Sequence, residues 1–97
     1  MSGRSAMVFD EVVDEAGPGR REVRGPAGRW RVTATVEKSG HIPIPAYSIV
    51  PRGAASASLH PRWPDVPATV EVDVPAGVAE LTWGWPHQTR FVVEVVA

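Results

Sequence analysis

Arginine side chains concentrate near the start of this 97-residue chain, where they could recognise carboxylates or phosphates. Residues 20–31 carry a net charge of +4, whereas residues 1–19 carry −3. A guanidinium group presents a planar fork of donors that binds an anion through two hydrogen bonds. The residues that we expect to be exposed on a hairpin turning at residues 25–28 are Arg24, Arg29 and Arg31. The alternative is intramolecular pairing of these arginines with the acidic residues of segment 10–15.

A second candidate for partner binding is a stiff loop bracketed by prolines. Residues 51–67 contain four prolines and a run of small residues, and loops of this length are usually functional or disordered. Tryptophan and arginine dominate the hot spots of protein interfaces. The candidate contact residues in this loop are Arg62, Trp63 and Asp65. Burial of Trp63 beneath the loop is the alternative interpretation.

Aromatic residues near the end of the chain suggest a different activity. Trp83 and Trp85 flank Gly84, and the spacing places both tryptophans on the same strand face as Leu81. Neighbouring aromatic rings on a strand could stack on sugar rings, so Trp83, Trp85 and Tyr47 are candidate carbohydrate-binding residues. Packing of these rings in the core is the alternative.

The sequence offers little catalytic chemistry, and we predict no catalytic residue, metal site or cofactor. Cysteine is absent, which excludes thiolate catalysis and Cys-ligated metal sites. The three histidines, His41, His60 and His87, lack the spacing of a zinc motif, although a small metal-dependent or acid/base enzyme remains a third hypothesis. No serine lies in a nucleophile-elbow motif, and no glycine-rich phosphate loop is present.

Alternating hydrophobic and polar residues indicate that β-strands position these groups. The clearest case is segment 29–37, whose apolar residues fall on one face: Trp30, Val32, Ala34 and Val36. The two prolines of segment 42–50 predict an edge strand, because proline cannot donate a backbone hydrogen bond. The expected strands are 6–13, 20–25, 29–37, 42–50, 69–74, 78–85 and 89–97, with an optional strand near 55–59.

An internal repeat supports a symmetric β architecture. The sequence Pro-Ala-Gly occurs at residues 26–28 and again 49 residues later at 75–77, with β-strand patterns on both sides of each copy. Proline and glycine favour turns of the backbone. Two hairpins with the same turn predict a single antiparallel β-sandwich of seven or eight short strands over residues 1–97, either jelly-roll-like or immunoglobulin-like.

The leading functional hypothesis is a non-catalytic protein-binding module, such as an inhibitor, an immunity-type protein or an accessory subunit. The partner would be another protein, or a second copy of the chain. The net charge of −1 disfavours nucleic acid, and no apolar run is long enough to predict a membrane span. Arginine dominates the basic residues and asparagine is absent, a usage typical of GC-rich genomes, so we expect a cytoplasmic protein of a bacterium or bacteriophage.

Overall fold

The computed structural model describes residues 5–13, 19–37, 47–62, 66–84 and 88–96. These residues form eight strands in two antiparallel sheets and contain no helix, which confirms the prediction of an all-β fold. None of the described residues belongs to a helix that could cross a membrane.

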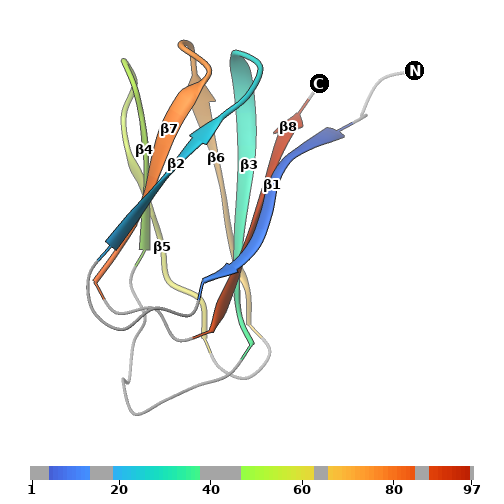
Figure 1. Cartoon of the computed structure of the whole chain (residues 1–97), viewed down its shortest axis with the longest axis vertical. Helices are drawn as coiled ribbons and strands as arrows, with labels where there is room; N and C mark the ends of the chain where they lie inside the picture. The colour runs from blue at the N-terminus through green and yellow to red at the C-terminus, as the bar shows by residue number, and fades with distance from the viewer. Residues whose placement is uncertain (1–4, 14–18, 38–46, 63–65, 85–87, 97) are drawn as a thin grey trace.

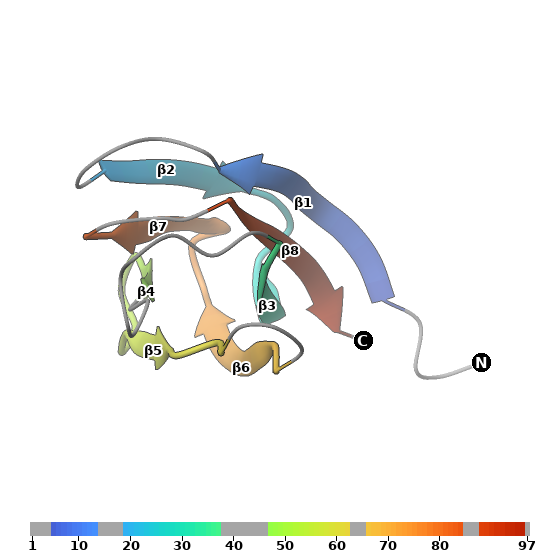
Figure 2. The same ribbon diagram turned by 90° about the horizontal axis from the view of Figure 1, so that it is seen from below.

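The eight strands divide equally between two packed sheets (Figures 1 and 2). The first, named here the β3 sheet, contains in spatial order β1 (Ser5–Val13), β8 (Thr89–Val96), β3 (Gly28–Val36) and β6 (Ala68–Val74). The second, the β7 sheet, contains β2 (Gly19–Arg24), β7 (Val78–Trp83), β4 (Tyr47–Pro51) and β5 (Ala57–Leu59). The edges of the two sheets correspond, so that β1 lies beside β2 and β6 beside β5 (Figure 2).

The core lies between the sheets and follows from the period-two pattern. All four apolar residues predicted to share a face of β3 are buried, and Trp30 among them is fully buried. The aromatic centre of the core comes from three strands: the ring of Trp83 stacks on Phe91 with centroids 6.1 Å apart, and Tyr47 meets Phe91 edge-on at 5.0 Å. Side chains from both sheets therefore interdigitate, as expected of a β-sandwich.

The two Pro-Ala-Gly segments connect the sheets, and this corrects the prediction of two hairpins. Residues 25–27 lead from β2 in the β7 sheet to β3 in the other sheet, and residues 75–77 lead back from β6 to β7. Each segment is therefore an arch between layers, and both arches lie at the same end of the molecule (Figure 1). The strands that flank an arch do not pair with each other, because they belong to different sheets.

The two arches lie against each other, and strand pairing continues across them without a slip. In the β7 sheet Arg24 faces Val78, and in the β3 sheet Arg29 faces Asp73. Between these pairs the amide of Gly25 donates to the carbonyl of Gly77 at 2.9 Å, which maintains the same register through the bend. Residues 19–36 and 68–83 thus form one antiparallel ribbon that folds over into both sheets.

Glycine is required where the arches touch. Gly77 has a φ of +69°, and a Cβ atom there would overlap the carbonyl oxygen of Gly25. The first arch is also held from the core side, because Trp30 Nε1 donates a hydrogen bond to Pro26 O at 2.8 Å. Close backbone approach and a buried tryptophan together define the geometry of this end of the sandwich.

The region around β4 both confirms and corrects the strand predictions. The optional strand near 55–59 is present as β5. Because β5 pairs with one side of β4 and β7 with the other, residues 47–51 form an interior strand rather than the predicted edge strand. The two prolines on which that prediction rested, Pro43 and Pro45, lie outside the described residues.

Candidate functional site

The arginines predicted to form one exposed cluster lie on opposite faces of the sandwich. Arg24 belongs to β2 and faces outward from the β7 sheet, whereas Arg29 and Arg31 belong to β3 and face outward from the β3 sheet. The correction has a simple cause, because the predicted hairpin turn is an arch that carries the chain from one layer to the other. The two groups of arginines must therefore be considered separately.

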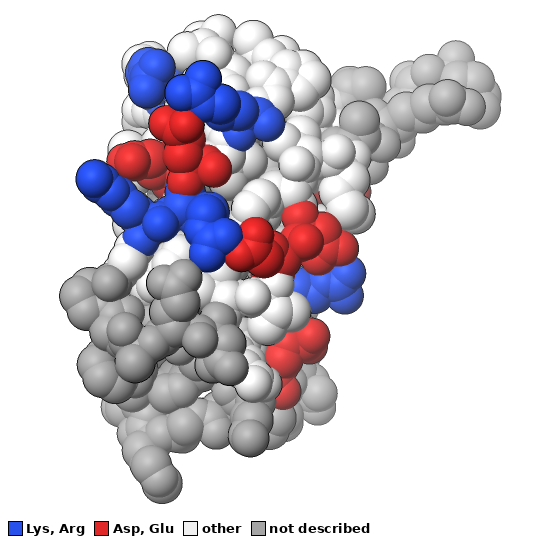
Figure 3. Space-filling model, viewed as in Figure 1, with Lys and Arg blue, Asp and Glu red and all other residues white. Residues whose placement is uncertain are grey.

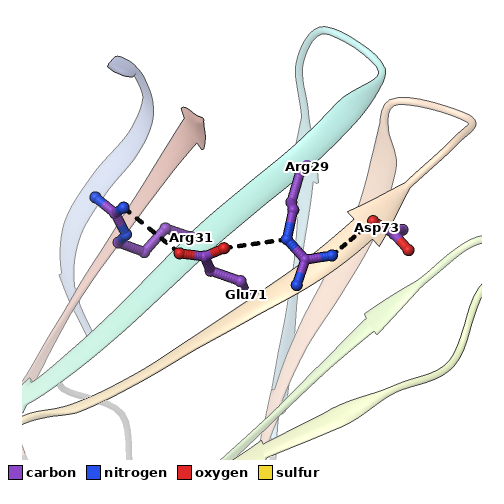
Figure 4. Close-up of polar contacts among 4 residues, drawn as sticks. All are labelled: Arg29, Arg31, Glu71 and Asp73. Carbon is purple, nitrogen blue, oxygen red and sulfur yellow. Dashed lines mark hydrogen bonds and ion pairs between the residues drawn. The ribbon is translucent and has the colours of Figure 1, made fainter. Parts of the chain in front are cut away.

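On the β3 sheet the arginines are neutralised by carboxylates of the neighbouring strand (Figure 4). Arg29 donates from Nε to Glu71 at 3.0 Å and from a terminal nitrogen to Asp73 at 2.8 Å. Arg31 reaches the other carboxylate oxygen of Glu71 at 3.5 Å. In register, Arg29 faces Asp73 and Arg31 faces Glu71, so each arginine lies opposite an acid.

The pKa values of this ladder reflect its mutual pairing. Hydrogen bonds to Glu71 and then to Asp73 raise the pKa of Arg29, and the hydrogen bond from Arg29 lowers the pKa of Glu71. The four side chains remain partly exposed, so water and salt screen these interactions. Arg29 and Arg31 are thus paired intramolecularly, but with acids of β6 and not with segment 10–15 as the alternative had it.

Two acids of segment 10–15 pair with other arginines, and one of these pairs lies at the seam between the sheets. Glu11 on β1 accepts a hydrogen bond from Arg21 on β2. The residue opposite Glu11 on β8, Phe91, and the residue opposite Arg21 on β7, Leu81, are both buried. This ion pair bridges the edges of the two sheets. Asp10 accepts two hydrogen bonds from Arg90, which lower its pKa.

The outer face of the β7 sheet has a different charge pattern. Outward residues of β2, β7 and β4 form three cross-strand rows, which are Arg24–Val78–Arg52, Glu22–Glu80–Val50 and Arg20–Thr82–Ser48. The position of Arg52 is set by its backbone amide, which donates to the carbonyl of Val78 at 3.0 Å. Figure 3 shows arginine and acidic side chains alternating over β2 and its neighbours. The rows are thus positive, negative and positive along the strands.

Two glutamates of like charge face each other in the middle row. Glu22 lies directly opposite Glu80, an arrangement that disfavours the strand pair. Arg24 donates to Glu22 at 2.6 Å and, with a further contribution from Arg52, lowers its pKa. Glu80 has only a distant contact with Arg20, at 3.9 Å. Repulsion between the glutamates is therefore relieved mainly on the β2 side.

A shallow hollow lies beside these glutamates. It has a volume of about 240 Å³ and is lined by charged and apolar groups, including Glu80, Arg52, Val50 and Val78. Val50 is 40% exposed, and Arg52 forms no ion pair with a described residue. Sequence reasoning missed this surface, because Arg52 and Glu80 are far from the arginine-rich stretch in the chain. Only the pairing of β2 and β4 with β7 brings them together.

The predicted partner-binding loop has an ordered base. Arg62 and Val66 form an isolated bridge in which each backbone amide donates to the other residue's carbonyl, at 2.7 and 3.0 Å. Both side chains are exposed, and Val66 is 55% accessible. The bridge joins the two ends of the segment that contains Trp63 and Asp65, and those two residues lie outside the described part of the chain.

The predicted aromatic platform is not a surface, and this prediction is corrected. Tyr47 and Trp83 are buried, with 1% and 4% of their surface exposed, and Tyr47 Oη lies 2.6 Å from Thr89 Oγ1. Their strands direct them to the inner face, where Phe91 covers both rings, so neither offers a face to a sugar. Trp85 lies outside the described residues.

The histidines form no metal centre among the residues that the structure describes. His60 is exposed beside the loop, and His41 and His87 lie outside the described residues. Within the described ranges no group of three or more histidine, cysteine or acidic residues could hold a metal ion.

Comparison with known proteins adds no family assignment. No protein-family model, curated protein or solved structure matches this chain. Function must therefore be inferred from the surfaces described above.

Proposed function

We propose that this chain is a non-catalytic protein-binding module whose partner docks on the loop that contains Arg62, Trp63 and Asp65. The scaffold would be a jelly-roll-like or immunoglobulin-like sandwich, and the setting the cytoplasm of a bacterium or bacteriophage. Both sandwich types support binding functions on the loops that connect their strands.

The reciprocal backbone pair between Arg62 and Val66 is the observation that supports this proposal best. A loop whose base is held by two hydrogen bonds loses less conformational entropy on binding than a free segment. The exposed Val66 and Arg62 provide an apolar contact and a guanidinium without a described ion-pair partner. Apolar residues beside arginine are typical of the centre of a protein interface.

The carbohydrate and enzyme alternatives have less support. Burial of Tyr47 and Trp83 removes two of the three residues on which the sugar-binding hypothesis depended. Within the described ranges, no group of three or more histidine, cysteine or acidic residues that could hold a metal ion favours the enzyme hypothesis. Arg29 and Arg31 are also weak partner-binding candidates, because their ladder with Glu71 and Asp73 would have to be broken.

Affinity capture followed by a binding titration tests the proposal. The captured protein is purified and titrated with wild type and with Trp63→Ala, for which we expect weakening by at least about 2 kcal/mol, or roughly thirty-fold. The melting temperature of Trp63→Ala should stay within about 3 °C of wild type, because truncation of an interface anchor leaves the core intact. Val12→Ala removes an exposed apolar side chain elsewhere and serves as the matched control.

Two results would contradict the loop as the binding site. One is a Trp63→Ala variant that loses stability but retains affinity, since the side chain would then belong to the core. The other is equal weakening by Trp63→Ala and Val12→Ala, which would indicate a nonspecific loss of binding.

A further inference from the structure

We propose that the outer face of the β7 sheet binds a second copy of this chain, through a symmetric interface in which rows of opposite charge meet. The face is defined by Arg24, Val78, Arg52, Glu22, Glu80 and Val50. This inference is independent of the proposed loop function, because it uses a different surface and a different partner.

The charge pattern of the face makes it complementary to itself. Adjacent rows are two residues apart along the strands, or about 7 Å. Two copies can face each other across a twofold axis that runs parallel to the rows, midway between the first and second. The positive row of each copy then lies against the negative row of the other. Such an isologous contact closes on itself and gives a dimer.

Individual residues match in this arrangement. Arg24 lies opposite Glu22 of the second copy, and by symmetry Glu22 lies opposite Arg24 of that copy. Arg52 lies opposite Val50 of the second copy and one strand away from its Glu80, a lateral distance of about 5 Å. A long arginine side chain can span that distance, so the residue that has no described ion pair gains an acidic partner.

Glu80, whose contact with Arg20 is distant, and Arg52, which has no described ion pair, favour this occupant over others. Glu22 and Glu80 repel each other across β2 and β7, and an incoming pair of arginines would relieve that repulsion. A purely acidic partner would meet these glutamates, and a purely basic one would meet the arginines. A partner with the same alternating rows meets neither obstacle.

The hollow supplies the apolar part of the contact. Val78 belongs to the first row and Val50 to the second. In the dimer Val78 therefore lies against the second row of the other copy and Val50 against its first row, so the exposed Val50 would be covered. Charged rims around a small apolar centre are the usual anatomy of protein interfaces. The face is small, so we expect reversible association that depends on concentration and salt.

The test is sedimentation of purified protein with paired charge reversals. From about 10 µM to about 1 mM at low salt, wild type should shift from 10.4 kDa towards twice that mass. Glu22→Arg with Glu80→Arg makes the face positive, and Arg24→Glu with Arg52→Glu makes it negative. Each double variant alone should be monomeric at concentrations at least about tenfold above the wild-type midpoint. An equimolar mixture of the two should form a heterodimer, because every row then meets its opposite.

The matched control reverses the same number of acids on the other side of the sandwich. Glu37→Arg with Asp73→Arg gives the same change in net charge and should dimerise like wild type. Because this control also removes the Arg29–Asp73 hydrogen bond, circular dichroism must show that it is folded at the temperature of sedimentation. Formation of the heterodimer also shows that both reversed variants are folded.

Wild type that stays monomeric at the highest concentration and lowest salt would overturn the proposal. So would dimeric wild type combined with a mixture that stays monomeric. Loss of loop binding would leave these sedimentation results unchanged, so the two proposals can fail separately.

Discussion

The two outer faces of the sandwich both contain arginine and acidic residues but arrange them differently. On the β3 sheet opposite charges face each other across strands, as Arg29 faces Asp73 and Arg31 faces Glu71. On the β7 sheet Glu22 faces Glu80, and the arginines occupy the adjacent rows. The first arrangement neutralises charge within each row, whereas the second leaves whole rows with one sign.

The difference separates charges that stabilise the fold from charges that remain for recognition. A ladder of opposite charges between adjacent strands supports their pairing and offers little to another molecule. Rows of one sign contribute less to the sheet and present a pattern that a complementary surface can read.

The largest effect is expected from a substitution that disrupts the contact between the two arches, because the arches connect the two sheets. We expect Gly77→Ala to reduce the free energy of unfolding by about 2–4 kcal/mol, because alanine disfavours the φ of +69° and its Cβ overlaps Gly25. This corresponds to a fall in melting temperature of about 10 °C or more, measurable by circular dichroism.

Gly53→Ala is the control for backbone strain alone. Gly53 also has a positive φ, of +80°, but the nearest atom to an added Cβ is 3.8 Å away. We expect a loss of about 1–2 kcal/mol. Equal losses for Gly53→Ala and Gly77→Ala would show that contact between the arches contributes nothing beyond strain.

Neutralising one charge on each face gives a direct comparison of their stabilities. Arg29→Gln removes the donor that serves two carboxylates and should lower the melting temperature by about 2–4 °C. Glu80→Gln relieves repulsion with Glu22. It should therefore lower the melting temperature by less than about 2 °C or raise it. Thermal unfolding at low protein concentration measures both in the monomer. A larger loss for Glu80→Gln would reverse the assignment of the two faces.

The smallest expected effect is a change in the pH dependence of stability. Because Arg29 lowers the pKa of Glu71 below its ordinary value of 4.5, the unfolded chain binds more protons there than the native chain. The stabilisation by this pair is therefore complete above pH 4.5 and is lost as the pH falls through the lowered pKa. NMR titration of the Glu71 carboxyl should show that pKa moving upward in Arg29→Gln. An unchanged pKa in that variant would mean that the hydrogen bond is not its cause.

The sequence predicted the strands well because alternation reports directly on a half-buried sheet. Residues 29–37 illustrate this, since each apolar position of the pattern is buried in β3. The short β5 was also foreseen, although its three residues carry little pattern. These signals are local, and they show where a strand lies and which of its residues share a face.

Pairing across layers could not be read from local signals. A Pro-Ala-Gly turn reverses the chain in a hairpin and in an arch alike, and only the partners of the flanking strands distinguish the two. The same limit explains why the predicted aromatic platform was wrong. The spacing of Trp83 and Leu81 shows that they share a face, but not whether that face points to the core or to solvent. Arg52 and Glu80 meet through β4 and β7, and no spacing in the chain predicts that neighbourhood.

The continuous register through the two arches also constrains how the molecule can fold. Residues 19–36 and 68–83 give each sheet one interior strand and one edge strand, yet they are separated by a long connection that must close before these strands can pair. Proteins dominated by such distant contacts fold in milliseconds to seconds rather than microseconds. The arch region is where the two segments can pair in both layers at once, so substitutions there should slow folding, whereas substitutions in the charged ladder should mainly speed unfolding.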